Sequence, residues 1–333
     1  MTAGSAWREG LRRVGGGPAI LLGVWALLTV VSLPLTLTLR GAIEAHLGES
    51  LEAERVADGA PYDWMQEFAG QASGAASSFG PTVIGFGAVV DNLSAFADGE
   101  APPAAIVVAG AVYLALWVFL AGGILDRYAR LRPTGVEGFF AACGVFFFRF
   151  LRLAVVAGLA YALLFGVVHP WLLDSTYAQL TRPVTSERSA FLVRLGLYAV
   201  FGVLLAGTSL VFDYAKVRAV VEDRRSMLGA LAASVRFLRN NGRAAAALYG
   251  LNVLLLVAVL ALYAVAAPGA GTSGPSMWLG FAIAQLYVVA RLCVKLAFWA
   301  SATALFQGRL AHAGYVARPQ PTWPDSPAAE ALN

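Results

Sequence analysis

Long runs of apolar residues, separated by shorter polar segments, dominate the pattern of hydrophobic and polar positions along the chain. A transmembrane helix needs about 20 apolar residues to cross a hydrocarbon layer about 30 Å thick. Six runs meet this requirement: Pro18–Leu39, Ala104–Leu125, Leu153–Leu173, Phe191–Phe212, Ala244–Ala267 and Trp278–Phe306. The pattern therefore predicts an all-α integral membrane protein, with six transmembrane helices in one polytopic domain over residues 1–317. The dipeptide His169-Pro170 is expected to end the third helix.

A second pattern, with apolar residues three and four positions apart, lies between the fourth and fifth spans. Leu228, Leu231, Val235 and Leu238 share one helical face, and arginines occupy the opposite face. This arrangement is typical of an amphipathic helix that lies in the membrane surface with its cationic face toward the lipid headgroups.

The stretch Phe139–Val168 is apolar but too long for one simple span. As a single helix it would measure about 45 Å, and it would carry Arg149 and Arg152 in the middle of the membrane. We therefore predict a break. Glu137–Phe148 would lie along the inner surface, and the span would begin near Leu153.

A sequence repeat supports that division. Arg-Phe-Leu-Arg at residues 149–152 recurs at residues 236–239, 87 positions later, and Leu-Ala-Gly at 120–122 recurs at 205–207. The repeat predicts a duplicated helical hairpin, in which an inner amphipathic helix precedes a span, an outer loop and a returning span. The basic stretch Trp7–Val14 is a candidate for a degenerate third copy.

The basic residues are distributed unequally between the predicted loops. With the N-terminus inside, the inner segments hold 17 Lys and Arg residues and the outer segments hold five. An excess of Lys and Arg marks the cytoplasmic side of a membrane protein. We therefore expect both termini in the cytoplasm. The richness in Ala, Gly and Arg favours a bacterial inner membrane.

Composition agrees with the membrane class. Of the 333 residues, 59% are hydrophobic and 13% are charged, against about 25% charged in soluble domains. The sequence pI of 9.2 does not indicate nucleic-acid binding, because no basic stretch is interleaved with aromatic residues. Cys143 and Cys293 both lie outside the predicted outer loops, so no structural disulfide is expected.

Two segments differ from the rest of the chain. The outer loop 41–103 carries ten Asp and Glu residues against Arg55 alone, with Arg40 just before it. Its first half is expected to be helical, and its Gly-rich part Phe79–Leu93 is too short to span. The loop could contact a protein partner. The proline-rich tail 318–333 is expected to be a disordered cytoplasmic segment.

Arg291 and Lys295 are the sharpest candidates for a site, because they lie one helical turn apart inside the last span. A charge at the centre of the bilayer costs about 2.5–3.5 kcal/mol. One interpretation is a cavity that binds an anionic substrate or lipid headgroup. The other is structural, and it is the favoured one: Lys295 extends to the inner boundary, and Arg291 pairs with Asp126 or Asp213 on a neighbouring span.

Asp126 and Asp213 end the second and fourth spans, in equivalent positions of the repeat. They could carry protons or cations, or they could pair with nearby basic residues, and the latter is favoured because basic residues surround both. The arginines of the predicted inner helices are candidates for binding anionic lipid. They are Arg149, Arg152, Arg236, Arg239 and Arg243.

No catalytic or cofactor motif is evident. Gly271-Thr272-Ser273-Gly274 matches the Gly-x-Ser-Gly of intramembrane serine proteases, but no histidine lies in the last span to act as its base, and a turn is the better interpretation. Phosphate-binding loops, dinucleotide fingerprints and Cys/His metal spacings are missing from the sequence. We therefore expect no enzyme activity, no cofactor and no metal.

The ends of the second and fourth spans, Asp126-Arg127-Tyr128-Ala129 and Asp213-Tyr214-Ala215-Lys216, each precede a basic stretch and Arg-Phe-Leu-Arg. In this the region Ala104–Gln307 resembles bacterial six-span proteins related to the membrane domain associated with glycerophosphodiester phosphodiesterases. The resemblance implies a six-span architecture. The hydrolase activity is not carried over, because we expect no attached hydrolase domain and because this chain has the long acidic outer loop.

Two functions remain open at this point. The first is a non-catalytic scaffold, accessory subunit or envelope-homeostasis factor that engages anionic lipid at its inner face. The alternative is a transporter or channel for an anionic small molecule or lipid, through a cavity near Arg291 and Lys295. An open cavity around Arg291 would favour the alternative.

Overall fold

The computed structural model describes residues 1–48, 50–58, 61–80, 85–100, 104–131, 135–267 and 274–312. Within these ranges the chain forms helices and no strand, so the fold class is all-α. Six of the helices are long and apolar enough to cross a membrane, which indicates a multi-pass membrane protein. The tail 318–333 and residues 271–273 of the Gly-x-Ser-Gly motif lie outside the described residues.

The helices follow the chain in a simple order, with short 3₁₀ and π segments between some of them. They are α1 (Ala3–Gly15), α2 (Pro18–Leu47), α3 (Glu52–Asp58), α4 (Tyr62–Gln71), α5 (Gly87–Asp98), α6 (Ala104–Arg130), α7 (Val136–Leu163), α8 (Tyr177–Thr181), α9 (Glu187–Val221), α10 (Met227–Ala266) and α11 (Pro275–His312). Each spanning helix extends beyond its predicted apolar run at one end or both. Charged residues such as Glu and Arg are good helix formers, so the helices continue into the polar flanks.

The predicted break between an inner surface helix and the third span is wrong. The helix α7 runs without interruption from Val136 to Leu163. Arg149 forms an ion pair with Asp223, in which Nη1 of the arginine lies 2.6 Å from Oδ1 of the aspartate. Arg152 is exposed. Long arginine side chains can thus reach polar surroundings without a break in the backbone.

The expected helix stop at His169-Pro170 is also wrong. The chain remains helical through this dipeptide by widening into two π-helical segments, Leu164–Val168 and Trp171–Thr176, before α8. Proline removes one backbone donor and its ring crowds the preceding turn. A π-helical turn is wider than an α-helical one, and here two of them flank the proline.

The helix α10, by contrast, is divided. Asn241 has non-helical backbone angles, φ −126° and ψ 16°, which separate the segment from Met227 to Asn240 from the long apolar segment that follows. The position of this kink agrees with the predicted start of the fifth span at Ala244. The side chain of Asn241 donates from Nδ2 to the carbonyl of Phe237 at 3.2 Å.

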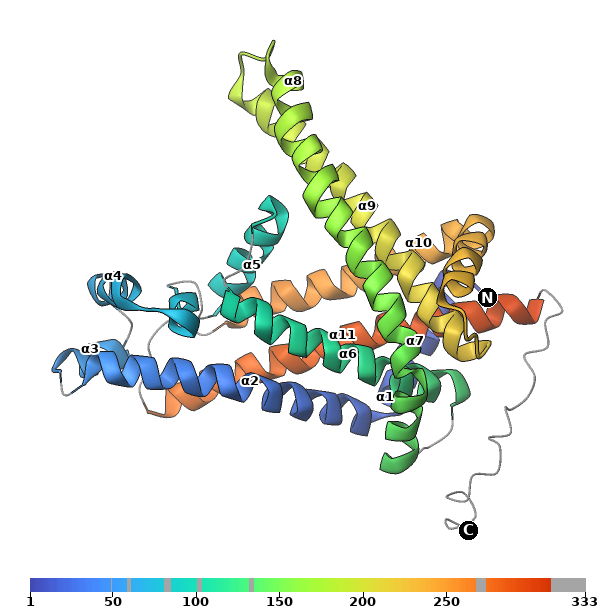
Figure 1. The fold of residues 1–333 in the computed structure, drawn as a ribbon, viewed down its shortest axis with the longest axis horizontal. Helices are drawn as coiled ribbons and strands as arrows, with labels where there is room; N and C mark the ends of the chain where they lie inside the picture. The colour runs from blue at the N-terminus through green and yellow to red at the C-terminus, as the bar shows by residue number, and fades with distance from the viewer. Residues whose placement is uncertain are drawn as a thin grey trace.

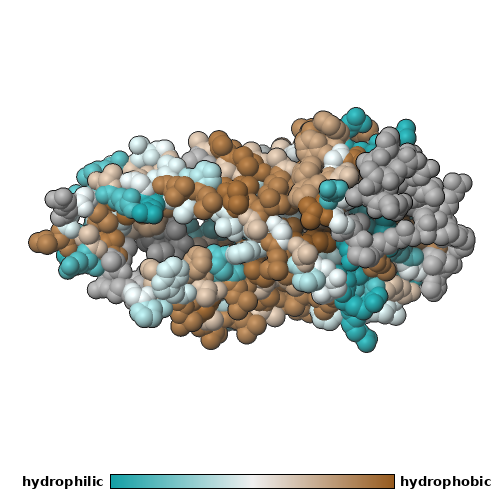
Figure 2. All heavy atoms as spheres, turned by 90° about the horizontal axis from the view of Figure 1, so that it is seen from below, coloured by the Kyte–Doolittle hydropathy of each residue, from teal (hydrophilic) through white to brown (hydrophobic). Residues whose placement is uncertain are grey.

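The long helices form two groups that diverge from one end of the molecule (Figure 1). The core group, α2, α6, α11 and the second half of α10, runs toward α3 and α4, whereas the arm, α7 and α9, rises toward α8 (Figure 1). Both groups meet at the basic end, which comprises α1, the α9–α10 turn, the first half of α10 up to Arg243 and the last turns of α11. Apolar residues cover the middle of the face in Figure 2, and polar residues gather toward its two ends.

The main hydrophobic core lies where the two groups meet. Its completely buried members come from several helices: Leu120, Ile124, Ala215, Val217, Leu296 and Leu305. The helix α1 completes this core by packing along α11. A Cβ atom on Gly10 would lie 2.5 Å from Cβ of Ser301, so only glycine permits this approach. The stretch Trp7–Val14 is therefore part of the packed bundle.

The predicted outer loop contains its own small cluster at the opposite end of the core group. Trp64, Met65 and Phe68 of α4 are buried against one another, and His46 at the end of α2 contacts the rings of Trp64 and Phe68 edge-on. The loop is therefore locally folded within the described residues, and its charged first half is helical.

Candidate functional site

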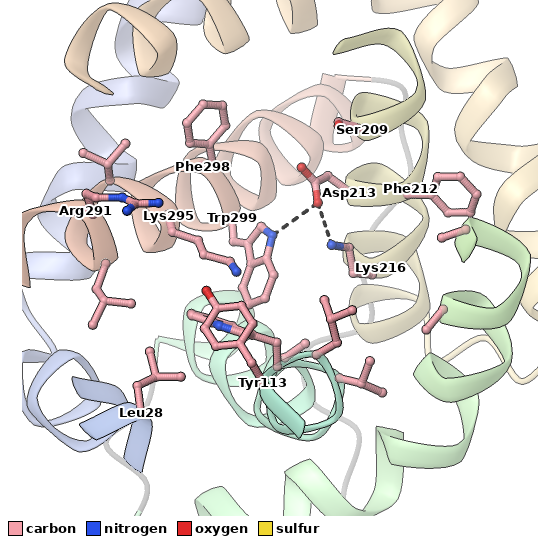
Figure 3. Close-up of a pocket in the computed structure, with 18 of the residues that line it drawn as sticks. Leu28, Tyr113, Ser209, Phe212, Asp213, Lys216, Arg291, Lys295, Phe298 and Trp299 are labelled. Carbon is pink, nitrogen blue, oxygen red and sulfur yellow. Dashed lines mark hydrogen bonds and ion pairs between the residues drawn. The ribbon is translucent and has the colours of Figure 1, made fainter. Parts of the chain in front are cut away.

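A cavity of about 960 Å³ lies between the core group and the arm. Residues of α2, α6, α7, α9, α10 and α11 line it, so every spanning helix contributes to its wall. Its volume is near the upper end of the range for ligand pockets. Figure 3 shows charged and aromatic side chains from α6, α9 and α11 converging on this space.

Lys295 of α11 extends across the ring of Trp117 of α6, with Nζ 3.5 Å from the ring centroid. The ring centroid of Tyr113, also of α6, lies 5.4 Å from Nζ. Among the described residues, no carboxylate lies within 4.0 Å of this ammonium. A cation over an aromatic face is stabilised by the ring quadrupole, but its hydrogen-bond donors remain available to a ligand.

Arg291, one turn before Lys295, also lines the cavity. Its guanidinium stacks 5.6 Å from the ring centroid of Tyr287, and its side chain is exposed. The expected pairing of Arg291 with Asp126 or Asp213 is wrong, because each of these carboxylates pairs with a basic residue of its own helix. Both Arg291 and Lys295 therefore line the cavity and have no carboxylate partner in the described part of the chain.

Asp213 and Lys216 of α9 stand on the opposite wall. Their ion pair measures 2.6 Å between Oδ1 and Nζ, and Trp299 of α11 donates its indole N–H to the same oxygen at 3.2 Å. Lys216 also lies over the Trp299 ring, 4.8 Å from its centroid. Figure 3 shows Lys216 and Lys295 pointing toward each other on either side of Trp299.

The remainder of the cavity wall is mostly apolar. The residues that provide it belong to five helices: Leu28, Leu114, Leu153, Ala157, Leu256 and Val288. Deeper in the arm, the hydroxyls of Tyr161 and Ser209 are hydrogen-bonded at 2.9 Å and join α7 to α9. The cavity thus combines a cationic region with an apolar cleft, which is the arrangement an amphiphilic anion requires.

Asp126, the repeat equivalent of Asp213, lies outside the cavity lining. It is 3% exposed, and Nε of Arg130 lies 2.7 Å from its Oδ1. The preferred interpretation of both aspartates as ion-paired residues agrees with these distances. Only Asp213 has that pair on a cavity wall.

The five arginines proposed for lipid binding fall into two classes. Arg149 is engaged, because it pairs with Asp223 and lies 5.1 Å from the ring centroid of Phe146. The other four are exposed and have no ion-pair partner within the described part of the chain: Arg152, Arg236, Arg239 and Arg243.

Sequence reasoning missed the residues that shape the cationic region. Trp117 and Trp299, whose rings meet edge-on at 5.5 Å, are ordinary apolar positions in the sequence. Lys216 belongs, by its place in the sequence, to the basic stretch that follows the fourth span. A spacing of three residues between Asp213 and Lys216 could have indicated a local ion pair, but no sequence signal places α9 opposite Lys295.

A set of polar contacts joins α5 to the arm. Asp98, at the end of α5, accepts a hydrogen bond from the hydroxyl of Tyr198 in α9 at 2.6 Å. This hydrogen bond, together with one from Ser94 and the charge of Arg194, holds the pKa of the Asp98 carboxyl below its usual value. His169 is hydrogen-bonded to the carbonyl of Ala97 at 2.8 Å.

Comparison with known proteins adds no assignment. No protein-family model matches the chain, and neither a curated protein nor a solved structure matches it. The resemblance to the membrane domain associated with glycerophosphodiester phosphodiesterases therefore stays a prediction.

Proposed function

We propose that the protein is a non-catalytic membrane protein that binds the anionic headgroup of a membrane amphiphile in the cavity between the core group and the arm. One observation carries the proposal: Arg291 and Lys295 line a cavity of about 960 Å³ and have no carboxylate partner among the described residues. Charged groups inside spans are costly unless they pair or line a functional cavity.

The depth of Arg291 and Lys295 in the membrane supports a lipid ligand over a soluble anion. Trp278 is a typical residue for the outer membrane boundary. Lys295 follows 17 residues later, which is about 26 Å along a helix and close to the thickness of the hydrocarbon layer. The cations would then lie near the inner boundary of that layer, where a headgroup sits, while its acyl chains occupy the apolar cleft.

The proposal includes an orientation. We propose that the basic end faces the cytoplasm of a bacterium, that both termini lie there, and that the segment from Met227 to Asn240 is an amphipathic helix at the inner face. The support is the distribution of 17 basic residues against five. A thiol introduced at Ser226 should resist membrane-impermeant labelling in intact cells, whereas one at Ser77 should react. Labelling of Ser226 would overturn the orientation.

We also propose that the two hairpins arose by duplication. The support is that Tyr128 and Tyr214, which occupy equivalent positions 86 residues apart, are each 1% exposed in the same core. Superposition of an experimentally determined structure tests this. Unequal membrane depths for Arg149 and Arg236 would show that the sequence repeat arose by chance.

Retention of lipid during purification tests the main proposal. The double variant Arg291→Gln/Lys295→Gln should retain less phosphatidylglycerol and cardiolipin than the native protein in native mass spectra. The matched control is Arg40→Gln/Arg55→Gln, which removes two charges from exposed ion pairs at the other end of the molecule. Equal retention in both double variants, with both folded, would refute the proposal.

A second candidate function is favoured by the exposed arginines of the basic end. Arg236, Arg239 and Arg243 could hold anionic lipid on the cytoplasmic surface, each contributing about 1 kcal/mol. The protein would then be a scaffold or accessory subunit, with the acidic segment 41–103 available to a protein partner. Replacing these three residues by Gln should reduce lipid retention if this surface, and not the cavity, holds the lipid.

Transport is the further step that the cavity would allow. Reconstitution into vesicles with a fluorescently labelled anionic lipid distinguishes a carrier from a binding subunit. A carrier exposes the label to an external quencher faster than protein-free vesicles do, and Lys295→Gln should abolish the difference. A rate equal to that of protein-free vesicles would restrict the function to binding.

A further inference from the structure

We infer that the ligand of the cavity is a phosphomonoester amphiphile, a lipid that ends in a terminal phosphate with close to two negative charges. This inference rests on the proposed function and specifies its ligand class. It depends on three features: the net charge of the cavity, the free donors on that charge, and the apolar cleft beside it.

The charge of the lining residues is unbalanced. Within the described part of the chain, the lining includes three cations, Lys216, Arg291 and Lys295, and one carboxylate, Asp213. Two positive charges are therefore left without a counter-ion. The other three groups line the same cavity as Lys295. In surroundings of low dielectric constant, uncompensated charge is strongly unfavourable.

A ligand with two negative charges neutralises this region, and a ligand with one does not. A phosphomonoester carries about −1.5 to −2 charges at pH 7, whereas a phosphodiester such as phosphatidylglycerol carries one. Zwitterionic headgroups would bring a further cation into a region that already has an excess of them. Charge balance therefore selects the monoester among common lipid headgroups.

The donors that remain free also fit a terminal phosphate. Lys295 can donate three hydrogen bonds and Arg291 five, and their described contacts are with aromatic rings. A terminal phosphate presents three acceptor oxygens, and arginine can bind two of them side by side. A phosphodiester has lost one of these oxygens to its second ester bond.

Asp213 sets the charge of the site and would determine its selectivity. Its carboxylate accepts from Trp299 and pairs with Lys216, so it withholds one cation from the ligand. Removal of this carboxylate would raise the net positive charge to three and release Lys216. Removal of Lys216 would lower the net charge to one. The preference for a dianion should therefore change in opposite directions in the two variants.

The apolar cleft indicates that the phosphate belongs to a lipid. Leu28, Leu114, Leu153 and Val288 line the same cavity as the cations. They would remain in contact with water if the ligand were free phosphate. Acyl or prenyl chains attached to the phosphate would cover them.

A matched pair of lipids tests the inference. Delipidated protein in mild detergent is titrated with an equimolar mixture of dioleoyl phosphatidic acid and its methyl ester, dioleoyl phosphatidylmethanol, and bound lipid is read by native mass spectrometry. The two probes differ by one methyl group and one charge. The acid should be bound in about tenfold or greater excess, since one extra unit charge at close range is a large electrostatic term.

The variants give the expected direction of change. Lys216→Gln should bring the ratio of acid to ester close to one, and Asp213→Asn should preserve or increase it. Lys295→Arg should keep the preference. If Lys216→Gln does not fold, the ratio measured on the native protein still decides the question. A native ratio near one would overturn the inference.

Two further results separate the possible failures. If acid and ester bind equally but Arg291→Gln/Lys295→Gln loses both, the proposed function stands and the monoester inference fails. If that double variant binds both lipids as the native protein does, the proposed function fails as well. Displacement of the bound lipid by an excess of inorganic phosphate would show that the site takes free phosphate, which also overturns the inference.

Discussion

The two halves of the sequence repeat, residues 120–152 and 205–239, share their key residues and differ in their surroundings. In the first, Asp126 is buried beside Arg130 and lies outside the cavity lining. In the second, Asp213 forms the equivalent local pair with Lys216, but that pair lies on the cavity wall. A repeated ion pair therefore stabilises the bundle in one copy and can contribute to a binding site in the other.

The arginines and glycines show the same divergence. Arg149 is held by Asp223, whereas Arg236 is exposed. A Cβ on Gly122 would lie 2.8 Å from Cβ of Phe146, whereas one on Gly207 would meet nothing within 4 Å. The difference arises because Gly122 lies against α7, whereas Gly207 is exposed on α9. Helix neighbours, rather than the repeated residues, decide which copy is structural.

The largest expected effect comes from the close approach of α6 to α7. Gly122→Ala would place a Cβ 2.8 Å from Cβ of Phe146 and 3.0 Å from the carbonyl oxygen of Ala142. Overpacking of this kind costs about 3 kcal/mol at the upper end of its range. Gly207→Ala, in the second copy, should be neutral or slightly stabilising. Thermal unfolding in mild detergent measures both, and equal melting temperatures would contradict the comparison.

The equivalent aspartates should separate stability from binding. Asp126→Asn removes the carboxylate charge beside Arg130 in a buried position, which should cost about 2 kcal/mol of stability. Asp213→Asn should change the melting temperature little, because its side chain is 21% exposed, and it should retain anionic lipid at least as well. A large loss of stability from Asp213→Asn alone would show that the functional difference between the copies is wrong.

Arg149 and Arg236, which occupy equivalent positions of the repeat, should differ less in their effect on stability. Arg149→Gln breaks the contact with Asp223, whose side chain is 64% exposed, so solvent limits the loss to about 0.5–1 kcal/mol. The change should lower the melting temperature by a few degrees at most. Arg236→Gln should leave it unchanged. If Arg236→Gln is the more destabilising of the two, Arg236 has a structural partner and the assignment of these residues is reversed.

The kink in α10 predicts the smallest effect. Asn241→Ala removes the hydrogen bond from Nδ2 to the carbonyl of Phe237, which should cost about 0.5–1 kcal/mol. Asn240→Ala is the control, because Asn240 is exposed in regular helix and Ala is the better helix former. Unfolding curves of the two variants should lie on either side of the native curve. A stabilising Asn241→Ala would show that the kink is not maintained by its side chain.

Much of the architecture could be predicted because it depends on local sequence. The length of each apolar run specifies a spanning helix, since backbone groups in lipid must bond within their own segment. The division of α10 near Asn241 could be predicted, because apolar residues three and four positions apart give way to a continuous apolar run at Ala244. The same reasoning failed for α7. There the sequence could not show that Asp223, 74 residues after Arg149, would meet it at the start of the next hairpin.

The candidate site, too, could be predicted from the sequence only in part. The sequence by itself identified Arg291 and Lys295, because a charge in an apolar run is conspicuous and costly wherever the helix lies. Only the tertiary structure decided that Trp117, Trp299 and Lys216 surround them and that Asp126 does not. Those contacts depend on how α6, α9 and α11 pack against one another, and these helices are distant in the sequence. The spacing of apolar residues shows which face of a helix is buried, but it does not show which other helix packs against that face.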